Sequence, residues 1–308
     1  MQYTCPPLEL SIMGRPVVIG SADAGLLAIL AAAYAEWLQG GPMDGPPIQL
    51  TLEAGDETAP DTPVQIGVVG PRLRLNGAGL HGWADARSLE AFCRVPASLA
   101  ARPGALVGEV TDTLLLFLLA RSGRVPVHAA GILCGRTAVV LAGRSGSGKS
   151  TLSLAAMARG LRILSDDTVY IQLQPRLRIW AFPRPVHVFP ADAPGFTDQV
   201  RLRGGKLKAV LPLPPCSEPP VADRAAVVLL ERGDRVRLEP IEPSVAAAAL
   251  SRLEPGFDLL AESSARAVEA VTASGAWRLV LSRDPAEAID VLMDRLGPEA
   301  VSAAASHG

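Results

Sequence analysis

The chain has 308 residues, of which 29 are basic and 31 acidic, and its net charge at pH 7 is −2. This length allows about two domains with their own cores, and a hydrophobic fraction of 49% excludes a disordered chain. The balanced charge provides no overall field for nucleic acid or an anionic membrane, so any anion must be bound locally. No uninterrupted apolar run approaches the roughly 20 residues that cross a bilayer, and the first residues lack the basic start of a secretory signal. We therefore expect a soluble, cytoplasmic protein with no nucleic-acid or membrane partner.

Residues 1–104 alternate short β-like runs with breaks rich in Gly and Pro. Leu8–Met13 and Pro16–Ile19 predict a hairpin with its turn at Gly14 and Arg15. Asp23 is placed to cap a helix that extends to about Leu38. Further strands are expected at Ile48–Leu52, Val64–Val69, Arg72–Leu75 and Leu89–Val95. The pattern predicts a smaller α+β domain, without a chemical motif, that serves substrate recognition or assembly.

Residues 105–297 predict a larger α/β domain, and residues 298–308 a flexible tail. A helix over Leu106–Ala120 opens this domain, Ala225–Leu230 and Arg235–Ile241 predict a hairpin, and Pro183–Pro220 an extended loop region. The other expected strands are Val127–Ile132, Thr137–Leu141, Arg162–Leu164, Val169–Leu173, Leu177–Phe182 and Ala276–Ser282. The other expected helices begin after Lys149 or cover Val245–Leu253, Ser263–Ser274 and Asp284–Leu296.

One segment, Gly-Arg-Ser-Gly-Ser-Gly-Lys-Ser-Thr, matches the phosphate-binding pattern G-x-x-x-x-G-K-[ST] and lies between an expected strand and an expected helix. Its glycines let backbone amides converge on a phosphate, and the helix adds the positive end of its dipole. Lys149 would contact the β- and γ-phosphates, and the Ser150 hydroxyl would complete a Mg²⁺ shell. The residues expected to bind ATP are Gly143, Arg144, Ser145, Gly146, Ser147, Gly148, Lys149, Ser150 and Thr151.

Two adjacent acids, Asp166 and Asp167, follow soon after this segment. A helix of about ten residues leads roughly 15 Å away from the phosphates, and a strand of about five residues returns a similar distance. The pair is therefore expected at the carboxyl end of a parallel strand, beside the phosphate loop. Because successive strand residues point to opposite faces, one carboxylate can serve a metal while the other faces the acceptor.

Other candidate residues lie on either side of this region. His128 begins a His-Ala-Ala-Gly stretch on the strand that precedes the phosphate-loop strand. A histidine in such a strand commonly packs in the core. Beside a nucleotide site, it could instead support the catalytic residues or face the phosphate acceptor. Arg184 is a candidate for neutralising the transferring phosphate, although exposed basic residues are commonly only solubilising. The same alternatives apply to the basic cluster Arg201, Arg203, Lys206 and Lys208. His187 is left unassigned, and the four cysteines are expected as buried thiols.

The order of His-Ala-Ala-Gly, the phosphate loop and Leu-Ser-Asp-Asp-Thr resembles the catalytic domain of the HPr kinase/phosphorylase family, which shares its core with phosphoenolpyruvate carboxykinase. The chain is most similar to HPr-kinase-like serine kinases of lasso-peptide and other ribosomal-peptide gene clusters. The resemblance spans about residues 125–190. It implies a P-loop kinase fold that uses ATP and Mg²⁺, with His128 as the active-site histidine. It also implies Asp166 as general base and Asp167, with Ser150, as metal ligand, the two aspartates being interchangeable in these roles.

The expected function is Mg-ATP-dependent phosphorylation of a serine in a peptide or protein, such as a ribosomal-peptide precursor. The chain lacks the Glu-x-Arg-Gly-x-Gly stretch of the bifunctional enzymes, which argues against HPr as substrate and against a reverse reaction. The resemblance favours a homo-oligomer. Two alternatives stay open: a kinase of a small molecule such as free serine, and a nucleotide-gated binding or assembly factor without transferase activity.

Overall fold

The structure, a computed structural model, describes residues 5–38, 43–56, 63–144, 146–182, 184–190, 200–203, 206–213, 221–251 and 260–297. Backbone contacts divide the chain into two units, of which the first covers residues 1–124 and the second chiefly residues 125–308. The predicted tail, residues 298–308, lies outside the described residues.

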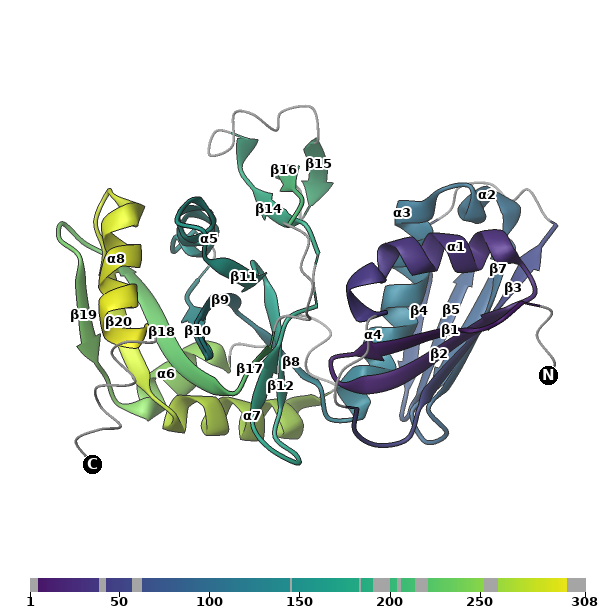
Figure 1. The fold of residues 1–308 in the computed structure, drawn as a ribbon, viewed down its shortest axis with the longest axis horizontal. Helices are drawn as coiled ribbons and strands as arrows, with labels where there is room; N and C mark the ends of the chain where they lie inside the picture. Colours follow the sequence, from purple (N-terminus) through teal and green to yellow (C-terminus); the bar gives the residue numbers. More distant parts are fainter. Residues whose placement is uncertain are drawn as a thin grey trace. The chain divides into compact units, whose positions relative to one another are not determined.

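The first unit is built on one sheet with helices packed against it (Figure 1). The strands follow the order β1-β2-β3-β7-β6-β5-β4, in which β2, β3 and β7 run parallel and the other neighbours antiparallel. The strands are β1 (Leu8–Ile12), β2 (Arg15–Ser21), β3 (Ile48–Gly55), β4 (Gln65–Val69), β5 (Arg72–Gly77), β6 (Leu80–Asp85) and β7 (Glu90–Pro96). The helical segments are α1 (Ala24–Ala33), η1 (Ala35–Trp37), α2 (Ala97–Ala100), α3 (Pro103–Ala105), η2 (Leu106–Thr111) and α4 (Asp112–Arg121).

The start of this unit follows the sequence closely. The predicted hairpin is present, but its turn consists of Met13 and Gly14, whose φ angles are +50° and +70°. Two positive φ angles are what a tight two-residue hairpin turn requires, so the turn lies one residue earlier than expected. The predicted cap is confirmed: the Asp23 carboxylate accepts hydrogen bonds from the backbone N–H groups of Gly25 and Leu26, at 2.7 and 3.1 Å.

Helix α4 and the turns before it, Pro103–Arg121, are long and apolar enough to cross a membrane, with a mean hydropathy of 1.5. Half of that apolar stretch is buried in the structure, and α4 packs against β3, β6 and β7. The core helix of a globular domain satisfies the same criteria of length and composition. Because α4 covers the sheet of the first unit, the boundary between the units falls after Arg124 and not near residue 104, where the sequence placed it.

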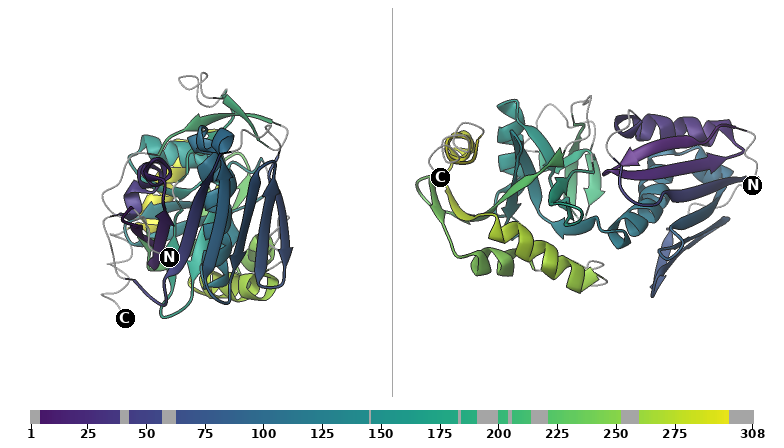
Figure 2. Two further views of the ribbon diagram at one scale, coloured as in Figure 1. Left: turned by 90° about the vertical axis from the view of Figure 1, so that its right-hand side faces the viewer. Right: turned by 60° about the horizontal axis from the view of Figure 1, so that its bottom comes forward.

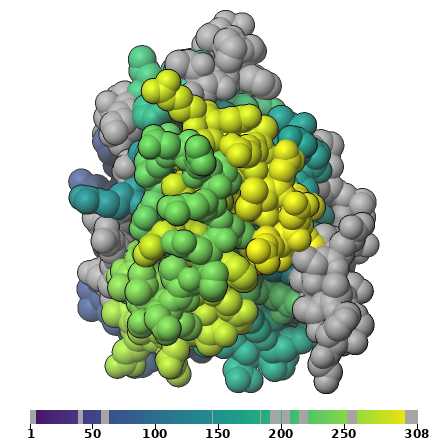
Figure 3. All heavy atoms as spheres, turned by 90° about the vertical axis from the view of Figure 1, so that its left-hand side faces the viewer, coloured from purple at the N-terminus to yellow at the C-terminus, as the bar shows by residue number. Residues whose placement is uncertain are grey.

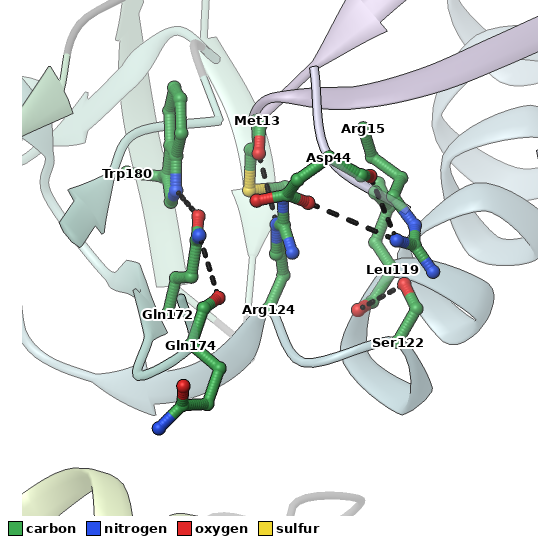
Figure 4. A network of polar contacts seen from close by, with 9 residues as sticks. All are labelled: Met13, Arg15, Asp44, Leu119, Ser122, Arg124, Gln172, Gln174 and Trp180. Carbon is green, nitrogen blue, oxygen red and sulfur yellow. Dashed lines mark hydrogen bonds and ion pairs between the residues drawn. The ribbon is translucent and has the colours of Figure 1, made fainter. Parts of the chain in front are cut away.

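Arg124 closes the first unit through a buried polar network (Figure 4). Its Nε donates to the backbone oxygen of Met13 at 2.9 Å, and its terminal nitrogen donates to the Asp44 carboxylate at 2.6 Å. Arg15 donates to the backbone oxygen of Asp44 at 2.9 Å. The end of the unit is thereby held to the β1–β2 turn, and the Asp44 carboxylate forms ion pairs with both guanidinium groups.

The second unit contains a six-stranded sheet in the order β11-β9-β10-β18-β20-β19, a four-stranded sheet β17-β13-β12-β8 and a three-stranded sheet β14-β16-β15 among the described residues. The strands that lead to the site are β8 (Val125–His128), β9 (Ala130–Cys134), β10 (Thr137–Ala142), β11 (Arg162–Ser165), β12 (Thr168–Gln172), β13 (Arg178–Trp180) and β14 (Val186–Val188). The later strands are β15 (Val200–Arg203), β16 (Lys206–Leu211), β17 (Val221–Ala222), β18 (Arg224–Arg232), β19 (Arg237–Pro240) and β20 (Ala276–Leu281). The helices are α5 (Lys149–Ala158), α6 (Pro243–Leu250), α7 (Ala261–Ala273) and α8 (Pro285–Leu296).

The helices cover the six-stranded sheet on both faces (Figures 1 and 2). One buried cluster joins the sheet to α5 and α8, and a second joins its other face to α6 and α7. Strands β10, β18 and β20 are parallel, and their apolar residues are buried on both sides, as such a sheet requires. In the space-filling view the C-terminal part of the chain, green to yellow, covers one face of this unit (Figure 3).

Three expectations for this unit were wrong. The single strand expected over 127–132 is two strands, β8 and β9, which break at Ala129 and belong to different sheets. β18 and β19 are not a hairpin, because β20 lies between them and pairs with both. The region 183–220, expected as an extended loop, contains the three-stranded sheet β14-β16-β15 in its described part.

The four-stranded sheet has a polar contact of its own between neighbouring strands. The indole N–H of Trp180 donates to the Gln172 side-chain oxygen at 2.7 Å, and the Gln172 amide donates to the backbone oxygen of Gln174 at 2.8 Å (Figure 4). Gln172 and Trp180 are both buried. The network satisfies polar groups that would otherwise weaken this sheet.

Candidate functional site

The glycine-rich loop, residues 143–148, connects the end of β10 to the start of α5. Gly148 is the N-cap of α5 with a φ of +108°, and no side chain caps the helix there. This positive φ favours glycine, and a Cβ on Gly148 would also lie 2.9 Å from the Leu281 Cδ1 atom, whose side chain would have to move. Gly146 has a φ of +83°, while Ser145 lies outside the described residues. The uncapped first turn of α5 therefore keeps its backbone N–H groups available for an anion.

The side chains of this loop add donors to those amides. The Lys149 ammonium group donates to the backbone oxygens of Gly143 and Arg144, at 2.5 and 3.5 Å. The Ser147 hydroxyl is buried and has no hydrogen-bond partner among the described residues. An ammonium group and a hydroxyl side by side are groups that phosphate oxygens can accept hydrogen bonds from. The donor set thus fits a nucleotide phosphate tail.

Arg232 contacts the same loop from β18, and no sequence pattern indicated this residue. β18 runs parallel to β10, with Leu229 opposite Ala142, so residues just beyond Leu229 lie beside the loop. The guanidinium group of Arg232 donates to the backbone oxygen of Gly146 at 3.4 Å. Had the parallel pairing of β10 with β18 been known, the rule that ligands lie at the carboxyl ends of such strands would have selected Arg232.

The two aspartates lie where the chain steps from one sheet to another. β11 pairs with β9, where Ser165 is opposite Gly131, and β12 pairs with β8, where Thr168 is opposite His128. Asp166 and Asp167 therefore cross between the sheets at the level where the chain also crosses from β8 to β9. This register brings His128 and Asp167 together, with 3.5 Å between the His128 Nδ1 and Asp167 Oδ1 atoms.

Asp166 has a different partner, His187 on β14. The backbone N–H of His187 donates to the Asp166 Oδ2 atom at 2.8 Å, and the His187 Nδ1 atom lies 4.0 Å from the same oxygen. The Asp166 side chain is 10% exposed, whereas that of Asp167 is 42% exposed. The sequence analysis left His187 unassigned. Its local signal is the alternation in β14: Val186 and Val188 are buried on one face of the strand, so the His187 side chain points to the opposite face.

The glycine-rich loop and the aspartates share one edge of the six-stranded sheet. β10 and β11 are both antiparallel to β9, which lies between them, so both end at the same edge. Leu141 is opposite Ala130, and Ser165 is opposite the next residue, Gly131. Because β9 lies between β10 and β11, the loop and the acids are separated by twice the distance between neighbouring strands, about 10 Å. A phosphate tail on the loop would therefore extend toward the acidic pair.

A cavity of about 650 Å³ opens beside the loop on the α6 face of the sheet. Its lining joins the start of the loop, His128, the end of β18 and one side of α6, namely His128, Gly143, Arg144, Leu229, Leu230, Glu231, Ser244, Val245, Ala248 and Ala249. The residue that contacts Asp167 and the residues that hold the Lys149 ammonium group thus border a single space.

Two of the basic candidates, Arg184 before β14 and Lys208 on β16, have aromatic contacts. The Arg184 guanidinium group lies over the Phe182 ring at 4.3 Å, and the Lys208 ammonium group over the Phe189 ring at 3.4 Å. The side chains of residues 201, 203 and 206 lie outside the described residues.

The acidic residues fit a Mg²⁺ ion that arrives with a nucleotide. Within the described residues, no group of three or more His, Cys, Asp or Glu side chains could hold a metal. Mg²⁺ at nucleotide sites takes one or two protein oxygens and completes its shell with phosphate oxygens and water. The carboxylates of Asp166 and Asp167 and the hydroxyl of Ser150, in the first turn of α5, provide oxygens of that kind.

Comparison with known proteins gives distant structural likenesses. No protein-family model matches the chain, and no curated protein matches it. Among solved structures the chain is similar to "Structure of the Hpr(Ser) kinase/phosphatase from Coxiella burnetii", with 14% sequence identity and a TM-score of 0.29. That match covers 56% of this chain and 94% of the other. The likeness is a distant structural relationship only.

Proposed function

We propose that this chain is a Mg-ATP-dependent kinase that transfers the γ-phosphate of ATP to a serine hydroxyl of a peptide or protein. The observation that carries the proposal is that the glycine-rich loop and two aspartates lie at one sheet edge, about 10 Å apart. A loop that leads into an uncapped helix binds phosphate. Phosphoryl transfer then needs positioning, positive charge and a carboxylate beside the terminal phosphate.

The nucleotide would be held by cations and backbone N–H groups around the glycine-rich loop. The Lys149 ammonium group would exchange the carbonyl oxygens of Gly143 and Arg144 for β- and γ-phosphate oxygens. The first N–H groups of α5 would hold the same tail, and Arg232 would add a second positive charge from the β18 side. These cations oppose the charge that builds up on the phosphate oxygens during transfer.

Exposure and contacts favour one of the two arrangements of the aspartates. Asp167 is the more exposed acid, and its neighbour His128 borders the cavity beside the loop. Asp166 is almost buried and is held by the backbone of His187. We therefore assign the general base to Asp167 and the metal-side position, with Ser150, to Asp166, which exchanges the roles expected from the resemblance.

In this scheme the acceptor oxygen bonds to the γ-phosphorus, and the bond from that phosphorus to the β,γ-bridging oxygen breaks. The hydroxyl proton passes to the Asp167 carboxylate, and ADP leaves. His128, 3.5 Å from Asp167, orients that carboxylate. Mg²⁺ bound with the nucleotide supplies neutralising charge on the phosphate oxygens.

The test is transfer from γ-labelled ATP, with Mg²⁺, to a library of serine peptides. Asp167→Asn should bind ATP but lose at least about 10²-fold in transfer rate, because the general base is gone. Lys149→Met should lose ATP binding itself. The exposed acid Asp234, in the β18–β19 connection, provides the matched control, since Asp234→Asn should leave both properties unchanged.

Two results would change the proposal. If Asp166→Asn rather than Asp167→Asn abolished transfer at saturating Mg²⁺, the roles of the two acids would be reversed. If the protein bound ATP but phosphorylated neither peptides nor free serine, the kinase proposal would be wrong and a nucleotide-gated binding factor would be favoured.

A further inference from the structure

We propose that the cavity beside the glycine-rich loop is a subsite for the acceptor peptide, and that it binds an uncharged, apolar side chain next to the serine that is phosphorylated. This inference rests on the proposed kinase function. It adds a specificity determinant, the wall formed by α6, which lies outside the loop and the acidic pair.

The position of the cavity places it on the acceptor side of the reaction. It borders Gly143 and Arg144, whose backbone oxygens hold the Lys149 ammonium group, and His128, which contacts Asp167. It lies on the α6 face of the six-stranded sheet, whereas α5, which would hold the phosphate tail, packs on the opposite face. An occupant of this cavity would therefore approach the terminal phosphate from the side away from α5.

The lining defines the chemistry of the occupant. Val245, Ala248 and Ala249 form one apolar side of α6, and Val245 is 43% exposed although it is hydrophobic. The acid on the lining, Glu231, is already paired with Arg278 at 3.2 Å. The arginine on the lining, Arg144, belongs to the glycine-rich loop that would hold the phosphate tail. A volume of about 650 Å³ is in the range of natural ligand sites. An aliphatic side chain such as that of leucine would be bound against the α6 wall, which offers a carboxylate no cation.

The probes are amidated pentapeptides with one central serine, in which the residue before or after it is leucine, glycine or glutamate. For the wild-type protein, one of the leucine peptides should exceed the matching glycine peptide by about tenfold or more in kcat/KM, the usual discrimination of an apolar pocket. The glutamate peptides should be no better than the glycine peptides. Free serine, which has no neighbouring side chain, should be a poor acceptor.

Two variants alter the cavity in opposite ways. Ala248→Phe fills it, and Val245→Ser makes its wall polar without filling it; both should reduce the leucine-to-glycine ratio to about one while the KM for ATP stays unchanged. The matched control is Ala265→Phe, an exposed alanine on α7 that does not border the cavity. A thermal melt verifies that each variant is folded, and Val245→Ser provides the test if Ala248→Phe is not.

The outcomes separate this inference from the function it rests on. A wild-type protein that phosphorylates the leucine and glycine peptides equally, or folded variants that retain the wild-type ratio, would overturn the subsite. A raised KM for ATP with an unchanged ratio would also overturn it, because the cavity would then hold the nucleoside. A wild-type protein that phosphorylates no acceptor would overturn the kinase proposal, and the subsite with it.

Discussion

Arg232 contacts the glycine-rich loop from a neighbouring strand, so its charge can be removed without changing the loop. We predict that Arg232→Ala lowers the transfer rate by about 10²-fold, because a cation near the phosphate tail is lost. The measurement is initial rate with γ-labelled ATP. Arg235, three positions further along and exposed, gives the control: Arg235→Ala should have no effect, and an equal loss there would show that only overall charge matters.

Two cysteines are predicted to be chemically inert in the folded protein. Burial raises the pKa of Cys93 to about 12 and that of Cys134 to about 11. The reactive thiolate forms only as the pH approaches these values, so at about pH 8 both thiols stay protonated. Iodoacetamide should leave them unmodified in native protein and modify them after unfolding, as read by peptide mass mapping. Rapid modification of native Cys134 would contradict its burial.

The sequence predicted site residues that lie in a continuous motif and missed those brought in from elsewhere. Lys149, Ser150 and the two aspartates belong to one strand–loop–helix–strand unit, whose dimensions can be calculated from helix rise and strand rise. His187 and Arg232 reach the same edge through sheet pairings between distant segments. No local pattern encodes such a pairing, so neither residue could be found before the strand order was known.

At the level of elements, Gly131 allows the two sheets of the second unit to approach each other. A Cβ at this position would lie 2.8 Å from the Val169 Cγ1 atom and 3.0 Å from the Leu164 Cβ atom. We predict that Gly131→Ala lowers the free energy of unfolding by about 1–3 kcal/mol through overpacking. Urea denaturation of the wild-type and variant proteins measures this difference in the free energy of unfolding. Gly67 on β4 has open space around it, so Gly67→Ala should not destabilise, and an equal loss at both glycines would refute the packing argument.

The error over β18 and β19 shows why sequence order is a poor guide to strand order. The run Ala225–Leu230, a short polar break and the run Arg235–Ile241 have the local signature of a hairpin. In the structure β20, which follows α6 and α7 in the chain, inserts between them and runs parallel to β18. Burial agrees with this order: β20 is largely buried and takes the inner position, whereas β19 is more exposed and forms the edge of the sheet.

For the whole molecule, every residue of the candidate site belongs to the second unit, which also contains both buried clusters of its sheet. We predict that residues 125–308, expressed alone, fold and bind ATP with a dissociation constant close to that of the full chain. Circular dichroism and calorimetric titration test this. A fragment that folds but does not bind ATP, while the full chain does, would show that the first unit contributes to the nucleotide site.

The division into two units was predictable from length and composition, but its position was not. Pro103 and Gly104 are typical of a linker, and they do interrupt the helical segment between α2 and α4. What assigns α4 to the first unit is the packing of its buried leucines on a sheet formed by residues 8–96. An amphipathic pattern shows that a helix has a buried side, and only the tertiary structure shows which sheet that side covers.

The chain passes between the four-stranded and the six-stranded sheet at Ala129 and again at the two aspartates, and this has a consequence for folding. His128 is fixed by the four-stranded sheet and Ser165 by the six-stranded one, and the acidic doublet bridges the two. A partly folded chain with only one of these sheets has no correctly oriented histidine–aspartate pair. If the chain is the kinase proposed above, such a partly folded copy would transfer no phosphate, and activity would appear only when both sheets had assembled.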